Sequence, residues 1–159
     1  MLTEAPWAFS ATPDDDLALD QRHLAELLAD RHKRIYAVAD DSWITTTSDG
    51  SPHADADLVA VAGIRRMNAP KFSHRAQLWG VFVAQSFRGR GFGRTVVEAA
   101  IDAARRWSGV DYVDLGVSEN APEALHLYRR LGFREWGREP ATTQVGDRRF
   151  DEIYMALKL

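Results

Sequence analysis

The stretch that decides the fold is VAQSFRGRGFGRT, which occupies residues 83–95. The apolar run LWGVFV, residues 78–83, leads into this stretch and has the composition of a buried strand. After it, apolar side chains recur at helical spacing, at Val96, Val97, Ala100, Ile101, Ala104 and Trp107. The stretch is therefore predicted to join the end of a strand to the start of a helix through three alternating glycines.

This glycine-rich junction has the chemistry of an anion site. The first N–H groups of a helix have no partner within the helix, and the helix dipole is positive at that end. Glycine lets the backbone adopt positive φ and approach a ligand closely, so a phosphate is the natural occupant. A purely structural connection is the alternative, but one glycine would serve it, and three in alternation favour the anion site.

Two nucleotide-binding motifs fit the junction poorly. A P-loop needs a lysine after its last glycine, and no lysine is near. A dinucleotide fingerprint reads G-x-G-x-x-G, whereas this chain has G-x-G-x-G, which is one residue short. Asp114 lies roughly where a ribose-binding acid would sit, but that fingerprint normally opens the first unit of a larger domain.

The rest of the chain predicts strands and helices around this junction. A helix is predicted over 12–33, and the turn-rich residues 40–57 are interpreted as a long surface loop. A later helix is predicted to begin at Asn120 as N-cap, with Glu123 at N3, and to end at Gly132. Strands are expected at 35–39, 58–66, 76–83, 110–117, 133–138 and 151–159.

These elements predict a single α/β (α+β) domain over residues 1–159. Strands 76–83 and 110–117 flank the glycine-loop helix, so they are expected to form a parallel pair with a right-handed crossover. The strands before them meander, which predicts antiparallel pairing. Gly80, in the middle of its strand, indicates a β-bulge or a close backbone approach.

Composition limits the classes of function. The net charge is −3, yet residues 1–57 carry twelve acidic and four basic side chains, so the basic part contains the glycine loop. No basic-aromatic array indicates a nucleic-acid partner, and no apolar run approaches the roughly 18 residues of a membrane span. The lack of cysteine and of a signal-peptide pattern is typical of a cytoplasmic chain. The acidic first third favours a cationic acceptor, with solubility alone as an equal alternative.

Two linked motifs resemble the GNAT superfamily of acyl-CoA N-acyltransferases. VAQSFRGRGFG at 83–93 is similar to that family's V-x-P-x-x-R-G-x-G-x-G stretch, with Gln85 in place of proline. VSEN at 117–120 and LYRRLGF at 127–133 are similar to its strand-end asparagine and its L-Y-x-x-x-G-F segment. The resemblance is close from about residue 58 onward. It implies a GNAT-like fold, a mixed and mostly antiparallel sheet with flanking helices, whose central parallel strands splay apart.

The resemblance also implies a binding site for acetyl-CoA, as co-substrate, and no metal. Backbone amides of the loop would bind the pyrophosphate of coenzyme A, and arginine side chains would add charge-assisted bonds or point to water. The pantetheine arm would lie between the splayed strands. The implied cofactor contacts are Val81, Phe82, Val83, Arg88, Gly89, Arg90, Gly91, Phe92, Gly93, Arg94, Thr95 and Asn120. The run His53-Ala54-Asp55-Ala56-Asp57 has ligand-type residues but is interpreted as solvated loop.

The resemblance assigns the general acid to Tyr128, which would protonate the leaving sulfur. The alternative is a core tyrosine on the apolar face of its helix. The general base stays open, because strand 76–83 has no carboxylate, whereas relatives often carry a glutamate there. Glu119, His74 or an acid of residues 49–57 could act through water, or the amine could lose its proton directly to solvent.

The sequence thus predicts an N-acetyltransferase that moves an acetyl group from acetyl-CoA to a primary amine, by direct attack in a ternary complex. The acceptor, a small molecule or a peptide amine, is not identified by the sequence, and a homodimer stays open. A CoA-binding sensor that keeps the loop but lacks turnover is the alternative from another class. A nucleotide-dependent oxidoreductase is the third hypothesis. Neither a nucleic acid nor a membrane is expected as a partner.

Overall fold

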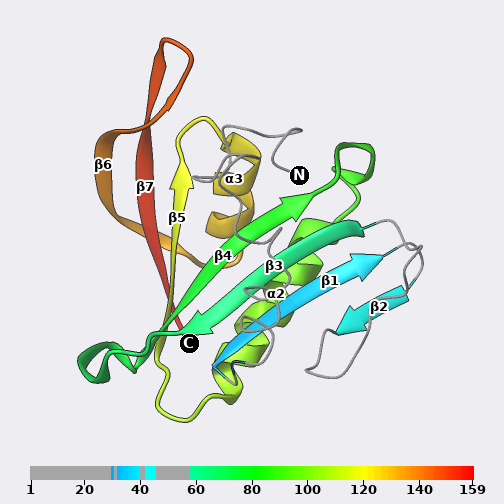
Figure 1. Ribbon diagram of the computed structural model, residues 1–159, viewed down its shortest axis with the longest axis vertical. Helices are drawn as coiled ribbons and strands as arrows, with labels where there is room; N and C mark the ends of the chain where they lie inside the picture. Colours follow the sequence, from blue (N-terminus) through cyan, green and yellow to red (C-terminus); the bar gives the residue numbers. More distant parts are fainter. Residues whose placement is uncertain (1–29, 31, 40–41, 46–57) are drawn as a thin grey trace.

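The computed structural model describes residues 30, 32–39, 42–45 and 58–159 (Figure 1). Seven strands form one sheet in the order β2-β1-β3-β4-β5-β7-β6. The strands are β1 (Lys33–Ala39), β2 (Ser42–Thr45), β3 (Leu58–Arg66), β4 (Arg75–Val83), β5 (Tyr112–Ser118), β6 (Arg134–Val145) and β7 (Arg148–Lys158). The helices are α2 (Phe92–Arg106) and α3 (Pro122–Arg130), with short 3-10 turns η2 (Pro70–Phe72) and η3 (Gln85–Phe87).

The centre of the sheet is the parallel pair β4 and β5, joined through α2. Their pairing covers only Arg75–Gln77 against Tyr112–Asp114, although both strands continue well beyond those residues. All other strand pairs are antiparallel. Figure 1 shows β4 and β5 diverging after this short ladder. The predicted mixed sheet with a splayed parallel pair is therefore confirmed.

A β-bulge in β4 accompanies the divergence of the two strands. Val61 of β3 pairs with Phe82, and Gly63 pairs with Trp79, so Gly80 and the residue after it face a single residue of β3. Gly80 has φ of +60°, which side chains rarely adopt. The bulge predicted at Gly80 is thus confirmed, and it increases the local twist of β4.

The core lies between the sheet and the two helices. The helix α2 packs across β1, β3 and β4 (Figure 1). Alternate residues of β5 and β7 point into this core, while their neighbours occupy the other face of the sheet. The largest fully buried side chains are Val59, Ile64, Val96, Val97, Val113, Ile153 and Met155. The even-numbered residues of β5 and β7 therefore share the face of the sheet away from this core.

The structure corrects two predicted boundaries in the N-terminal half. The loop predicted over 40–57 contains β2, which pairs with β1 as a hairpin, because SWIT combines aromatic and β-branched residues that favour a strand. Lys33 begins β1 rather than ending the predicted helix 12–33. The rest of that helix lies outside the described residues.

The C-terminal hairpin is longer than predicted. The strands expected at 133–138 and 151–159 extend to Val145 and start at Arg148. The first strand continues through Pro140, because β6 is an edge strand, where proline is tolerated. The register of β6 against β7 shifts between Glu139 and Thr143, and Ala141 in that interval has φ of +53°.

Among the described residues, no helix is long and apolar enough to cross a membrane.

Candidate functional site

The predicted anion loop lies between the end of β4 and the start of α2. Gly89 has φ of +74° and Gly91 has φ of +90°, and a Cβ at either position would meet nothing within 4 Å. These two glycines therefore allow a backbone conformation with positive φ, and the space beside them is open. Gly93 differs, because its Cβ would lie 3.2 Å from Val83 Cγ2, so this glycine lets α2 approach β4 closely.

The N-terminus of α2 presents unpaired donors to that open space. Gly91 is the N-cap in a left-handed conformation, and no side chain caps the helix. The Thr95 N–H donates to the Gly91 carbonyl at 3.1 Å, and the Thr95 hydroxyl donates to the same oxygen at 3.2 Å. The N–H groups of residues 92–94 precede that first helical bond, so an external acceptor must satisfy them. The loop therefore has the geometry of an anion cradle.

The three arginines of the loop have different surroundings. Arg88 donates through Nε to the Val83 carbonyl at 3.1 Å and so ties the loop to the end of β4. Arg90 lies over the rings of Phe87 and Phe92, with its Cζ 5.2 Å and 5.3 Å from the two centroids. Arg94 forms an ion pair with Glu98, with 2.9 Å between Nε and Oε1. The guanidinium of Arg90, stacked on two rings, stays beside the cradle without a described carboxylate partner.

The predicted strand contacts lie beside the gap between β4 and β5. Phe82 is buried and Val81 and Val83 are partly buried at the end of β4, beyond the last residue that pairs with β5. Within the described ranges, this section of β4 pairs with β3 alone, and its other edge faces the gap. That edge offers backbone donors and acceptors to an extended ligand.

Asn120 does not cap α3 as predicted. Pro122 occupies the first helical position and disfavours helical geometry in the residue before it. Ala121 is therefore the N-cap, with φ of −110° and ψ of 65°, and Asn120 lies one residue outside the helix. Glu123 accordingly stands at N2 rather than N3. The Asn120 Oδ1 is buried and accepts no hydrogen bond within the described part of the chain.

Tyr128 lies in the last turn of α3 and is 5% exposed. Gly132, with φ of +95°, ends the helix in the predicted C′ position, and the Phe133 N–H donates to the Tyr128 carbonyl at 3.0 Å. The Phe133 ring meets the Tyr128 ring edge-on, with 5.8 Å between centroids. Burial raises the pKa of Tyr128 far above its ordinary value of 10.0. The side chain is therefore fixed in position and protonated at neutral pH.

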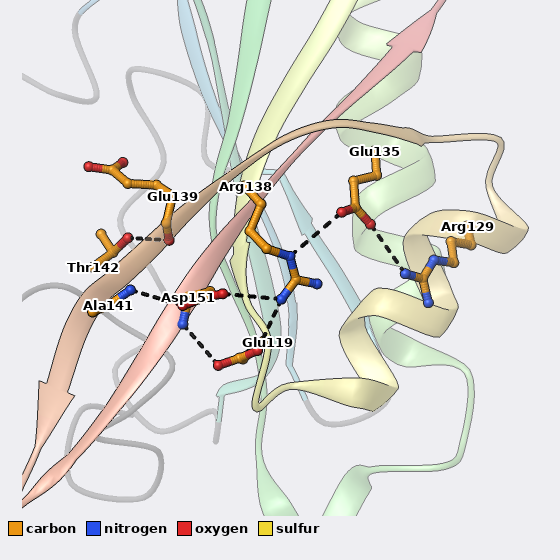
Figure 2. A network of polar contacts seen from close by, with 8 residues as sticks. All are labelled: Glu119, Arg129, Glu135, Arg138, Glu139, Ala141, Thr142 and Asp151. Carbon is orange, nitrogen blue, oxygen red and sulfur yellow. Dashed lines mark hydrogen bonds and ion pairs between the residues drawn. The ribbon is translucent and has the colours of Figure 1, made fainter.

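Glu119 is held in a polar network that joins β5, β6 and β7 (Figure 2). Its Oε2 accepts from Arg138 Nη1 at 3.0 Å, and its Oε1 accepts from the Asp151 N–H at 3.0 Å. Arg138 also contacts Asp151, whose pKa is lowered by a hydrogen bond from the Ala141 N–H and by that guanidinium. Both oxygens of Glu119 are thus engaged in holding the strands together.

Sequence reasoning missed one carboxylate, that of Glu152 on β7. A Cβ placed on Gly116 of β5 would lie 2.4 Å from Glu152 Oε1, so this carboxylate lies against the backbone of β5. The pairing of Ser118 with Glu152 brings the two strands into this register. The signal was weak, because only the alternation of β7 and a glycine in β5 point to the contact.

The remaining predicted candidates give no cluster. Among the residues that the structure describes, no group of three or more His, Cys, Asp and Glu could hold a metal ion. His53, Asp55 and Asp57 lie outside the described residues, as do the other acids of residues 49–57. His74 is partly buried in the connection before β4, where its carbonyl accepts from the N–H groups of Asp111 and Tyr112.

Comparisons with known proteins agree with this geometry. A family profile described as "Acetyltransferase (GNAT) family" matches residues 5–133. The chain is 34% identical over 111 residues to N-alpha-acetyltransferase RimI of Mycobacterium tuberculosis, covering 63% of this chain and 66% of that protein. It is 37% identical over 92 residues to streptothricin acetyltransferase of Streptomyces lavendulae, covering 57% and 46%. Each match spans less than two thirds of the relative's length.

A solved structure reproduces the fold over nearly the whole chain. The acetyltransferase of GNAT family from Streptococcus pneumoniae superposes with a TM-score of 0.74 at 15% identity, covering 96% of this chain and 84% of that one. At that identity the likeness establishes the fold alone.

Proposed function

Because the chain belongs to the acetyltransferase (GNAT) family, we propose that it transfers an acetyl group from acetyl-CoA to a primary amine. Both substrates bind together and the amine attacks directly, so no acetylated form of the protein is made. The observation that carries this proposal is the cradle of Gly89 and Gly91 at the N-terminus of α2, next to the gap between β4 and β5.

The residues present fit coenzyme A. The open space at both glycines and the unpaired N–H groups of α2 suit a pyrophosphate, and Arg90 supplies a cation beside it. The edge of β4 that faces the gap suits the amide groups of a pantetheine arm. The buried Asn120 Oδ1 is a further acceptor without a described partner. When bound, acetyl-CoA supplies the acetyl group as an activated thioester.

Tyr128 holds the proton for the departing sulfur. The tyrosine is buried and its raised pKa keeps it protonated, so the hydroxyl is a donor throughout the neutral range. The T-shaped contact with Phe133 and the cap at Gly132 fix its ring. Glu119, in contrast, is engaged with Arg138 and the Asp151 backbone, which argues against a free base at that position.

The acceptor class follows from the chemistry rather than from a relative's name. One relative is named for N-alpha-acetyl transfer and another for streptothricin, so relatives of similar identity are named for different acceptors. We propose a primary aliphatic amine, in a small molecule or at a peptide terminus. The test is steady-state release of coenzyme A with spermidine, an aminoglycoside and a short peptide, with mass detection of the product. Tight acetyl-CoA binding without any acetylated amine would favour the sensor instead.

A further inference from the structure

We propose that Glu152 accepts the proton that the acceptor ammonium must lose, which makes it the general base missing from β4. This inference rests on the proposed acetyl transfer. It identifies the acceptor as an aliphatic ammonium and places it on the face of β5 and β7 away from the helical core.

A glycine on the neighbouring strand leaves room for the Glu152 carboxylate. A Cβ at Gly116 would lie 2.4 Å from Glu152 Oε1 and 3.3 Å from Cδ. Every other residue at position 116 would therefore displace the carboxylate. The side chain fills the place that a side chain of β5 would otherwise take, so β7 supplies a carboxylate on the surface of β5.

That place is at the opening between the parallel strands. Asp114 is the last residue of β5 that pairs with β4, and Gly116 lies two residues further along the same face. From there on, β4 and β5 are separate. The carboxylate thus lies beside the section of β5 along which the proposed thioester would be held.

The charges around Glu152 suit a proton acceptor. Burial and the nearby carboxylate of Glu139 on β6 raise the pKa of Glu152 above 4.5. Tyr154, on the same strand, donates its hydroxyl to Glu139. Arg75 of β4 and Arg138 of β6 are paired with other carboxylates, Arg75 with Asp114, and Arg138 with Glu119 and Asp151. Among the described residues, no group donates a hydrogen bond or an ion pair to the Glu152 carboxylate.

Further groups on this part of the sheet suit an amine. Ser118, the cross-strand partner of Glu152, is 8% exposed, and its Oγ has no hydrogen-bond partner in the described part. Trp136, 65% exposed, stacks on Tyr154 with 5.5 Å between ring centroids. Two carboxylates, an unpaired hydroxyl and aromatic faces together attract an ammonium group on an aliphatic chain.

The proton balance is simple. The acceptor's ammonium gives one proton to Glu152, which releases it to water. The neutral nitrogen then forms its bond to the acetyl carbon while the bond from that carbon to sulfur breaks. Tyr128 gives its proton to the sulfur and is reprotonated, through water, by the second proton that the nitrogen loses. One proton in total leaves the protein for each amide formed.

The test compares pH profiles of the wild type and Glu152→Gln. The acceptor is whichever of spermidine, the aminoglycoside and the peptide gives the highest rate. For the wild type, kcat/KM should rise through an enzyme pKa and then flatten. Glu152→Gln should lower kcat/KM at pH 7 by about tenfold to a hundredfold. The kcat/KM of this variant should recover as pH approaches the amine's own pKa, near 10. Glu135→Gln, in another carboxylate of β6 paired with arginines, should keep the wild-type profile.

A second readout does not depend on turnover. In the protein with coenzyme A, carboxyl carbon NMR should show the Glu152 signal shifting as spermidine is added, while the Glu135 signal stays constant. If the wild type is active and Glu152→Gln has the same pH profile of kcat/KM, the assignment of Glu152 alone is overturned. The same holds if the rise of kcat/KM through the enzyme pKa disappears in Glu119→Gln instead. A wild type that binds acetyl-CoA but acetylates no amine would overturn the proposed function and this inference with it.

Discussion

Arg75 of β4 and Asp114 of β5 form a bidentate ion pair across the parallel ladder, just before the two strands separate. Arg75 Nε lies 2.6 Å from Asp114 Oδ2, and the second guanidinium nitrogen bonds the other oxygen. The guanidinium also lies over the Tyr112 ring, 4.7 Å from its centroid. The hydrogen bond to Asp114 raises the pKa of Arg75 above its ordinary value. The pair therefore closes the narrow end of the gap and defines where the opening begins.

Asp114→Asn should destabilise the protein because it removes the charge from this partly buried, bidentate pair. We expect a loss of about 1 kcal/mol in the free energy of unfolding, reduced at high salt. Chemical denaturation measures it. The control is Asp102→Asn, whose partner Arg105 lies on an exposed turn of α2, and there the loss should be about 0.3 kcal/mol. Equal losses in both variants would contradict a special role for the Arg75–Asp114 pair.

Gly91→Val should weaken acetyl-CoA binding. Valine disfavours φ of +90°, and its side chain would fill the open space beside the N-terminus of α2. We expect at least a tenfold rise in Kd, which corresponds to about 1.4 kcal/mol. Calorimetry on the folded variant measures it. Gly146→Val imposes similar backbone strain at φ of +59° in the β6–β7 turn, also with nothing within 4 Å, and should leave Kd unchanged. Unchanged affinity in Gly91→Val would remove the cradle from the binding site.

Tyr128→Phe should slow the reaction without affecting cofactor binding. The change removes one buried hydroxyl, and the edge-on contact with Phe133 is kept. We expect kcat to fall about a hundredfold, within the usual range for a lost general acid, with acetyl-CoA affinity near that of the wild type. Tyr112→Phe, which keeps the ring beneath Arg75, is the matched control and should keep full turnover. Full turnover in Tyr128→Phe, with chemistry limiting the rate, would exclude the acid role.

Local signals explain which parts of the fold were predictable. The glycine loop, the bulge at Gly80 and the stop at Gly132 each require a backbone conformation that glycine adopts readily, so the sequence alone indicated them. Asn120 was assigned to the wrong position, because both Asn120 and Pro122 signal a helix start and the proline decided it. The strand predicted over 133–138 was too short, because β6 is an edge strand and continues through Pro140 to Val145.

The carboxylate of Glu152 could not be found in this way, because its position depends on register rather than on neighbours in sequence. Gly116 and Glu152 come together only through the antiparallel pairing of β5 with β7. A shift of one residue in that pairing would turn Glu152 to the other face of the sheet. Turn and cap signals fix the ends of strands, but they do not fix which residues of two distant strands lie opposite each other.

Glu152→Gln should also change the dependence of stability on pH, whether or not an amine is bound. Burial and Glu139 raise the pKa of Glu152 in the folded protein above its ordinary value, so the folded state holds this proton more tightly than the unfolded state does. The stability contributed by the protonated carboxyl is therefore complete below that ordinary value and is lost as pH rises through the raised pKa. Glutamine keeps the neutral form at every pH.

Thermal unfolding should show similar Tm values for both proteins near pH 4, and by pH 8 the Tm of Glu152→Gln should be higher than that of the wild type. The control Glu135→Gln loses ion pairs with Arg129 and Arg138 and should show no such gain. If the Tm of the wild type instead rises relative to that of Glu152→Gln as pH rises, the carboxylate is stabilised as an anion. That result would contradict its role as a proton acceptor.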